Sequence, residues 1–216
     1  MAAFLMPWFP PLCMDVGLIQ GSYPLHPAAR YGMDAVWVQP LDLYSPPSSG
    51  IFHIYVDGSG GIEATEASEK IEPTWSFVVF SLSEDGTYVF HGAMGGYVIH
   101  ESYHPLSLGA KVADSATAEM SAMTWALAFA VQCPFISELS IMYDSKFSAE
   151  VAQLQAKHTA YPVLSELLSS LLMVMERKAP VEWQHIYSHE GHPFNELVDS
   201  FCTLMGKRQI PSTFSA

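Results

Sequence analysis

Apolar side chains recur at every second position in the first half of the chain, a period that is typical of a β-strand with one buried face. Phe52, Ile54 and Val56 show this period most clearly. A polar loop at 62–73 and a glycine turn at 83–86 separate the apolar stretches, so strands that are neighbours in sequence are expected to pair antiparallel. The pattern predicts three strands, over residues 51–56, 74–82 and 87–99, the last as one strand or two because Gly95-Gly96 interrupts it.

From about residue 115 the apolar spacing changes to three and four positions, which indicates amphipathic helices. Ser115 or Thr117 is expected to cap the first of them, and Pro134 ends it. Helices are predicted over 115–133, 145–156, 161–178 and 195–206, and strands over 138–143 and 181–187. The order β-β-β-α-β-α-α-β-α predicts a mixed α/β (α+β) fold with a five-stranded sheet, three strands antiparallel and two parallel, and helices on both faces.

Prolines mark the domain boundary. Eight of them lie between residues 7 and 47 without any sustained apolar period, so residues 1–49 are predicted to form a proline-rich arm or linker. The segment 46–50, Pro-Pro-Ser-Ser-Gly, is the clearest boundary. We expect one domain over 50–208, which is long enough for a sizeable core, and a short tail over 209–216.

The chain is acidic. Its 216 residues carry a formal charge of −13, with 22 Asp and Glu against 9 Lys and Arg. A generic nucleic-acid-binding surface needs cations that contact phosphates. Any nucleic-acid function therefore has to depend on a local site or on a metal ion that bridges protein and phosphate.

The cysteines and the longest apolar run bear on where the protein acts. Cys13, Cys133 and Cys202 are widely spaced, without a Cys-x-x-Cys pair. We interpret them as free thiols in a reducing intracellular compartment, the nucleus or the cytoplasm. The charge-free run 120–137 has nearly the length of a membrane span. Its Ser, Thr, Gln and Pro residues favour a buried helix of a soluble domain, so no membrane partner is expected.

Four acidic residues stand where predicted elements begin or end. Asp57 ends the first strand, Glu119 lies in the first turn of the 115–133 helix, Asp144 ends a strand, and Asp199 lies in the last helix. Ligand sites in α/β sheets form at strand ends, and converging carboxylates repel one another unless cations neutralise them. Such oxygen ligands suit Mg²⁺ or Mn²⁺, and two ions about 4 Å apart can clamp the attacking and leaving oxygens of a phosphodiester. His189 lies on the predicted loop before the last helix, and a histidine facing a carboxylate in this way suits metal-assisted chemistry on a phosphate.

Each acid also has a simpler interpretation when it is taken alone. Asp57 before a glycine is a common start of a turn, and Glu119 suits the positive end of a helix dipole. Asp144 with Ser145 could cap the next helix, and Asp199 could lie on a solvated face. It is their joint occurrence, in this order of elements and with the His189 loop, that favours a shared site.

A zinc site is the alternative that the histidines suggest. His185, His189 and His192 are spaced by four and three residues, and such ligands converge on one face of a helix. Gly191 and Pro193 exclude a helix at this position. A carboxylate site for Mg²⁺ is therefore the preferred interpretation.

Four motifs resemble those of the type 1 ribonuclease H domain family: Tyr55-Val-Asp57-Gly58-Ser59, Thr117-Ala-Glu119-Met-Ser-Ala122, Met142-Tyr-Asp144-Ser145, and Ser188-His189-Glu-Gly191-His192-Pro193-Phe-Asn195-Glu196-Leu-Val-Asp199. The resemblance covers residues 50–208, and in wording it looks closest to ribonuclease H domains of LINE-type retroelement polyproteins. It implies endonucleolytic hydrolysis of the RNA strand of an RNA–DNA hybrid with two Mg²⁺. It also implies that Asp57, Glu119, Asp144 and Asp199 are the metal ligands, and that His189 assists proton transfer or product departure.

The same resemblance implies where the substrate binds. Small residues at Gly58, Ser59 and Gly60 can bring backbone groups close to RNA 2′-hydroxyls. Further contacts are implied for Ser115, Thr117, Ser145, Lys146 and Asn195. The sequence departs from the family where an asparagine often precedes the helical glutamate, and it has no basic insert after Asp144. Weak hybrid binding by the isolated chain is expected.

The expected function is thus that of a ribonuclease H. The resemblance also implies that the domain is part of a retroelement reverse transcriptase, with the RNA–DNA hybrid and a polymerase domain as partners. Two alternatives stay open at this stage. One is a non-catalytic nucleic-acid-binding or structural domain of a larger polyprotein. The other is a nuclease of the same fold that acts on duplex RNA or single-stranded DNA.

Overall fold

The structure is a computed structural model that describes residues 49–62, 71–104, 106–156, 160–187 and 191–207, together with the backbone of 36–38. Its strands are β1 (Val36–Val38), β2 (Ile51–Ser59), β3 (Thr74–Leu82), β4 (Tyr88–Tyr97), β5 (Glu138–Tyr143) and β6 (Val181–His185). Its helices in these ranges are α2 (Ser115–Gln132), α3 (Lys146–Ala152), α4 (Pro162–Lys178) and α5 (Pro193–Gly206).

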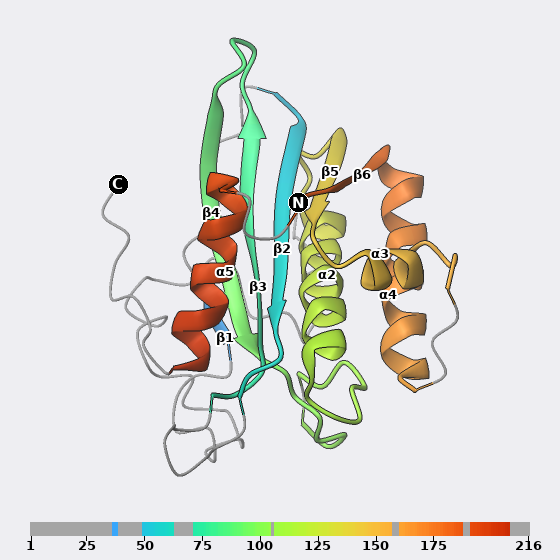
Figure 1. Ribbon diagram of the computed structural model, residues 1–216. Helices are drawn as coiled ribbons and strands as arrows, with labels where there is room; N and C mark the ends of the chain where they lie inside the picture. Colours follow the sequence, from blue (N-terminus) through green and yellow to red (C-terminus); the bar gives the residue numbers. More distant parts are fainter. Residues whose placement is uncertain are drawn as a thin grey trace.

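The strands form one mixed sheet in the order β1-β4-β3-β2-β5-β6 (Figure 1). β2, β3 and β4 pair antiparallel, β5 runs parallel to β2, and β6 runs parallel to β5. The five predicted strands, β2 to β6, and their mixed antiparallel and parallel pairing are confirmed. The sequence pattern missed β1, which pairs antiparallel with β4, because three residues are too few to show a period. The rest of the predicted arm and the 209–216 tail lie outside the described residues.

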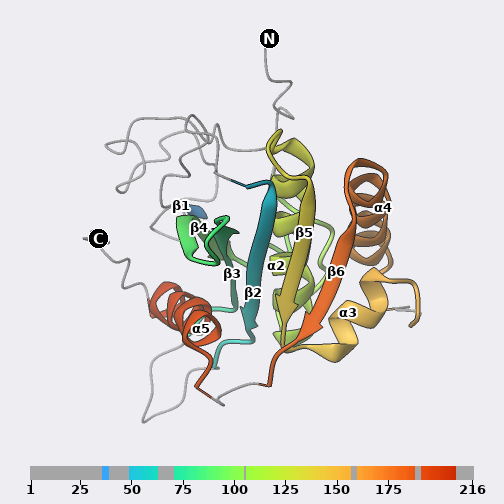
Figure 2. The ribbon, with the colours of Figure 1, turned by 90° about the horizontal axis from the view of Figure 1, so that it is seen from above.

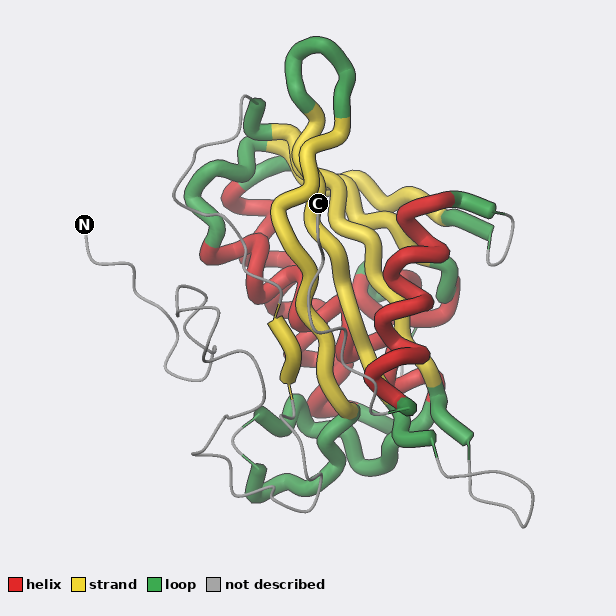
Figure 3. Tube along the Cα trace, turned by 90° about the vertical axis from the view of Figure 1, so that its left-hand side faces the viewer, coloured by secondary structure: helices red, strands yellow, loops and turns green. Residues whose placement is uncertain are grey.

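Helices cover both faces of the sheet, with α5 on one side and α2 and α4 on the other (Figure 3). Successive residues of a strand point to opposite faces. Phe52, Ile54 and Val56 therefore join the large core that includes α2, while Tyr55 joins the smaller core with α5. The alternation seen in the sequence is thus the alternation between two hydrophobic layers.

The charge-free run around 120–137 is explained by the burial of α2. Every side chain from Thr117 to Ala130 is buried, and Trp125 stacks on Trp75 of β3 with ring centroids 5.3 Å apart. A helix that packs against a sheet on one side and against α4 on the other needs apolar residues all round. No helix in the described part of the chain combines the length and apolar character needed to span a bilayer.

The sequence left open whether the stretch before residue 99 forms one strand or two. In the structure it is a single strand, β4, which continues through Gly95 and Gly96. The irregularity lies elsewhere, between Val79 and Phe80 of β3, whose partners are Gly92 and Phe90. Gly95 has a packing role, because a Cβ at this position would lie 3.0 Å from the carbonyl oxygen of Trp75. Gly95 therefore leaves room for the neighbouring β3, and the glycine pair does not end the strand.

Several predicted boundaries were wrong by a few residues. α3 ends at Ala152 and not at 156, because Leu154 takes a left-handed conformation with φ of 58°, which a helix does not accommodate. β6 ends at His185, two residues earlier than predicted. α5 begins at Pro193, two residues before Asn195, since proline is well suited to the first helical position.

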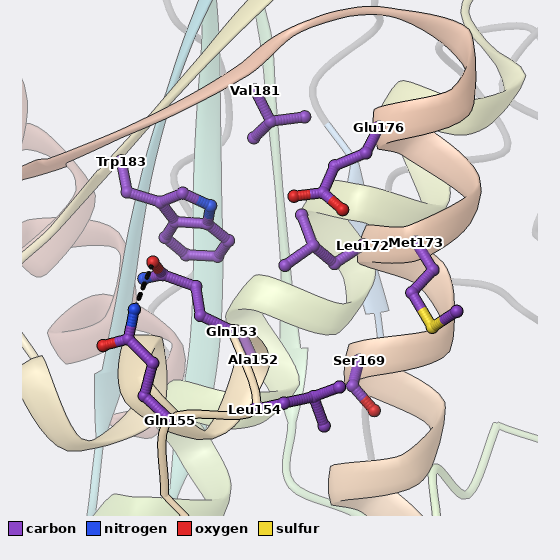
Figure 4. Close-up of a pocket in the computed structure, with 10 residues that line it drawn as sticks. All are labelled: Ala152, Gln153, Leu154, Gln155, Ser169, Leu172, Met173, Glu176, Val181 and Trp183. Carbon is purple, nitrogen blue, oxygen red and sulfur yellow. Dashed lines mark hydrogen bonds between the residues drawn. The ribbon is translucent and has the colours of Figure 1, made fainter.

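A pocket of about 300 Å³ lies between α4, β6 and the segment that follows α3 (Figure 4). Leu172 of α4 and Trp183 of β6 line it, and the Gln155 side chain donates a hydrogen bond of 3.2 Å to Gln153 at its rim. None of the four acidic residues singled out in the sequence lines this pocket. It is a separate feature from the candidate active site.

Candidate active site

Three of the four acidic residues converge at one end of the sheet. β2 and β5 pair in parallel with Tyr55 opposite Met142, so Asp57 near the end of β2 and Asp144 just after β5 are neighbours. Glu119 reaches the same point from α2. One carboxylate oxygen from each residue lies within 4.8 Å of the others. The predicted proximity of Asp57 and Asp144 at adjacent strand ends is confirmed, with the detail that β2 extends past Asp57 to Ser59.

Gly58 is what allows Glu119 to come so close to Asp57. A Cβ at Gly58 would lie 2.2 Å from the backbone nitrogen of Glu119 and 2.4 Å from the carbonyl carbon of Ala118. Any other residue would push α2 away from β2, because backbone atoms cannot move aside as the end of a side chain can. A backbone hydrogen bond from Gly58 to the Glu119 carboxylate also fixes that side chain.

The sequence suggested Ser115 or Thr117 as the cap of α2. In the structure the N-cap is Asp114. The Asp114 side chain accepts a hydrogen bond of 2.8 Å from the Thr117 backbone, and Thr117 Oγ1 accepts one of 2.9 Å from the Asp114 backbone. The Tyr161 hydroxyl donates to the second carboxylate oxygen of Asp114. Because the helix begins at Ser115, its first turn holds no acidic residue. The expectation that Glu119 lies in the first turn was wrong.

The carboxylates are held under electrostatic stress. Burial, followed by the charges of Asp144 and Asp199, raises the pKa of Asp57 to about 7. Burial and the charges of Asp57 and Asp144 raise the pKa of Glu119 well above its usual range. Glu119 Oε2 is buried without a hydrogen-bond donor. Close, buried carboxylates of this kind are destabilising unless a cation neutralises them.

The donor set fits Mg²⁺ or Mn²⁺. All three converging ligands are carboxylates, which hard divalent cations prefer, and the unsatisfied Glu119 oxygen has the electron pair that such a cation would take. Among the described residues this is the only group of three potential metal ligands. His185 instead contacts the Asp144 carbonyl oxygen at 3.2 Å, and His192 packs on Tyr55 with ring centroids 5.3 Å apart.

Asp199 lies outside the group of three but acts on it. It is in α5, on the other side of the sheet from α2, and its charge contributes to the raised pKa of Asp57. α5 is fastened to the sheet by hydrogen bonds of 2.9 Å from Ser76 to the Val198 carbonyl and of 2.8 Å from Thr74 to the Cys202 carbonyl. These bonds hold Asp199 close to the acidic cluster, at the C-terminal end of β2 that carries Asp57.

Cys202 is a neighbour of the site that the sequence did not reveal. Its thiol donates to the Asp57 carbonyl oxygen at 3.3 Å and is fully buried, and burial raises its pKa well above the usual range. Cys133 and Cys202 are both free thiols, as predicted, while Cys13 lies outside the described residues. The spacing of Cys202 three residues after Asp199 was the only available signal, since both face the sheet from one side of α5.

The structure divides the residues that were predicted to bind substrate. Thr117 is fully buried and its hydroxyl is committed to Asp114, so it stabilises α2 and cannot face a substrate. Asn195 is also buried, and its side-chain oxygen has no hydrogen-bond partner. Ser145 caps α3 by accepting a hydrogen bond of 3.4 Å from the Ser148 backbone. Lys146 is exposed.

The other predicted substrate contacts, Gly58, Ser59, Gly60 and Ser115, lie where the end of β2 meets the start of α2. Gly60 packs against the start of α2, where a Cβ would lie 3.0 Å from Ser115. Ser59 is half-buried at the end of β2. His189, the predicted proton-transfer residue, falls in 188–190, outside the described residues. The backbone from Gly58 to Gly60 therefore lies against the start of α2, next to Glu119.

A mixed sheet of this order, with helices on both faces and acids at adjacent strand ends, defines an α/β protein of the ribonuclease H-like fold with an acidic cluster that fits hard divalent cations. The family model described as RNase H matches residues 78–205. The chain belongs to the ribonuclease H family and is an RNase H-type nuclease by class. The matched range includes Glu119, Asp144 and Asp199 but starts after Asp57, whose place in the site is given by the structure.

Solved structures agree on the fold. The N-terminal RNase H domain of rv2228c from Mycobacterium tuberculosis superposes with a TM-score of 0.52 at 15% identity, over 74% of this chain and 95% of that one. LC9-RNase H1, a type 1 RNase H with the type 2 active-site motif, gives a TM-score of 0.52 at 14% identity, over 77% of this chain and 76% of that one. Comparison with curated proteins finds no match. The resemblance in wording to LINE-type elements receives no support from these comparisons.

Proposed function

We propose that this protein is an endonuclease that hydrolyses the RNA strand of RNA–DNA hybrids and depends on two Mg²⁺ ions, for which Mn²⁺ can substitute. The observation that carries the proposal is the convergence of the buried Asp57 and Glu119 with the half-buried Asp144, within 4.8 Å, on a ribonuclease H fold. A domain that only binds nucleic acid has no use for such a cluster, because it costs stability and repels phosphates.

The residues of the site have separate tasks in this proposal. Asp57, Glu119 and Asp144 would hold the ions, with Asp199 completing the negative site from α5. Bound there, the ions would supply charge stabilisation to the displacement at the scissile phosphate. The backbone from Gly58 to Gly60 lies against the start of α2, where it can approach the RNA 2′-hydroxyls that distinguish RNA from DNA.

His189 would move the proton. A histidine outside the ligand set can take a proton from the attacking water or give one to the leaving 3′-oxygen. The products would then be a 3′-hydroxyl and a 5′-phosphate. We propose a reducing intracellular compartment, which suits the free, buried Cys133 and Cys202. We also propose that a polymerase domain of a retroelement reverse transcriptase is a partner.

A panel of labelled substrates tests the proposal: RNA–DNA hybrid, duplex RNA, duplex DNA and both single strands, each with Mg²⁺ or with EDTA. We expect cleavage of the RNA strand of the hybrid only, and only with Mg²⁺. Asp144→Asn should abolish it, while the matched control Glu150→Gln, an exposed acid on α3, should cleave normally. Cleavage by Asp144→Asn at the wild-type rate, or cleavage in EDTA, would exclude the assignment.

Binding of the metal can be measured without turnover. Mg²⁺ that binds only the folded protein raises its melting temperature, and the rise should be absent in Asp144→Asn. The Glu150→Gln control should keep the wild-type response. A melting temperature that does not respond to millimolar Mg²⁺ in the wild-type protein would contradict a metal site at this cluster.

A further inference from the structure

Tyr187 follows β6 at the same edge of the sheet at which Asp144 follows β5. β5 and β6 run parallel and end at the same edge of the sheet, with α3 next to them (Figure 2). Beyond the end of β6, the Ile186 backbone still donates a hydrogen bond of 2.7 Å to the Tyr143 carbonyl. His185 contacts the Asp144 carbonyl at 3.2 Å. These contacts hold Tyr187 at the strand end from which Asp144 projects.

The Tyr187 ring is both supported and open. His185 meets it edge-on, with ring centroids 4.9 Å apart, and His185 in turn packs on Tyr143 at 5.6 Å. The Lys146 ammonium lies 5.9 Å from the centre of the Tyr187 ring. Even so, 60% of the Tyr187 surface is exposed. We refer to Tyr187 and Lys146 together as the Tyr187 shelf: an anchored aromatic ring beside a cation.

Electrostatic attraction contributes little to nucleic-acid binding by this chain. It has a formal charge of −13, and one of its few cations, Lys178, is occupied by the carbonyl oxygens of Ala130 and Val131 at the end of α2. Stacking of a base on an aromatic ring needs no net positive charge. It does need a free base face, and bases inside a duplex offer none because their neighbours cover both sides.

We propose that the Tyr187 shelf binds an unpaired nucleotide that flanks the hybrid, with the base or sugar against the tyrosine ring and the adjoining phosphate at Lys146. This deepens the proposed function and rests on it, since it places a single-stranded extension next to the acids that cleave the paired RNA. The enzyme would therefore prefer hybrids that end in a single-stranded extension over blunt hybrids.

The test compares a blunt hybrid with hybrids of the same sequence that carry a four-nucleotide extension of RNA or DNA at either end. Binding is measured with the full chain, with Ca²⁺ in place of Mg²⁺ to suppress cleavage. The wild-type protein should bind at least one extended hybrid about 5- to 150-fold more tightly than the blunt one, the range that one stacked base provides. Tyr187→Ala should bind both equally, and Tyr187→Trp should restore the preference.

Lys146 gives an independent readout. Lys146→Gln should weaken binding of the extended hybrid and reduce the slope of log affinity against log salt by about one contact, whereas Tyr187→Ala should leave that slope unchanged. Tyr88→Ala is the matched control. Tyr88 is 37% exposed and lies at the β3–β4 hairpin, at the opposite end of the sheet (Figure 1), so this variant should keep the preference.

The outcomes separate the shelf from the catalytic assignment. A wild-type protein that cleaves hybrids but shows no preference for any extension overturns the shelf and leaves the proposed function intact. A Tyr187→Ala variant that keeps the preference, or a Tyr187→Trp variant that lacks it, also overturns the shelf. If hybrids are not cleaved but the Tyr187-dependent preference is present, the shelf stands and the proposed function fails.

Discussion

Replacing Asp57 with asparagine should abolish catalysis and, in the absence of metal, stabilise the fold. Burial and the charges of Asp144 and Asp199 raise the pKa of Asp57 from 3.8 to about 7, so the folded protein disfavours the ionised carboxylate. Asparagine has nearly the same shape and carries no charge. Its side-chain oxygen can still accept the hydrogen bond that the Gly58 backbone gives to Asp57, and the bond from the Cys202 thiol to the backbone carbonyl of residue 57 is unaffected.

The magnitude follows from the pKa difference. Each pKa unit corresponds to 1.36 kcal/mol, so a rise from 3.8 to about 7 costs the metal-free protein about 4 kcal/mol once both the folded and unfolded states are ionised. Because the folded-state pKa is the higher one, the folded protein holds more protons between about pH 4 and pH 7, and its stability falls as the pH rises through this window. Asp57→Asn should therefore gain about 2–4 kcal/mol at pH 8 and little at pH 4.

The assay is urea unfolding in EDTA at pH 4, 6 and 8, followed by fluorescence and circular dichroism. Glu84→Gln is the control, since Glu84 is exposed in the β3–β4 turn and its loss should leave stability nearly unchanged at every pH. Saturating Mg²⁺ should reduce the advantage of Asp57→Asn at pH 8, because the wild-type protein then gains binding energy. A variant that is less stable than wild type at pH 8, or equally stabilised at pH 4 and 8, would refute the reasoning.

Three further predictions address the packing, the chemistry and the grip on substrate. Gly58→Ala should destabilise the fold by about 1–3 kcal/mol or more and lower cleavage, because its Cβ meets the α2 backbone at 2.2 Å; chemical unfolding with wild-type stability would contradict this contact. His189→Ala should slow turnover about 10²–10⁴-fold while the Mg²⁺-induced rise in melting temperature stays, and loss of that rise would instead make His189 a ligand. Titrations of blunt hybrid with the wild-type protein in Ca²⁺ should give a slope of log affinity against log salt of about −2 to −3. A slope steeper than about −6 would contradict this and would require an extended basic surface on the chain.

The order and type of most elements could be predicted from the sequence alone. Apolar residues at every second position in β2, and at three and four positions in α4 and α5, report which side of an element is buried, and this depends only on local geometry. The acids could be singled out for the same reason, since Asp144 follows β5 and Asp199 lies within α5. The ends of helices and strands were predicted less accurately, because a residue in the left-handed conformation, such as Leu154, leaves no periodic signal in the sequence.

The composition of the active site was decided by the tertiary structure. Asp57 and Asp144 are far apart in sequence and meet because β5 pairs with β2, while Glu119 joins them because Gly58 lets α2 approach β2. The raised pKa of Asp57, the thiol of Cys202 beneath it and the Tyr187 shelf all depend on which elements lie side by side. A periodic pattern records the burial of each residue within its own element, but distances between elements depend on the order of strands and on the packing of helices across them, which no single stretch of sequence contains.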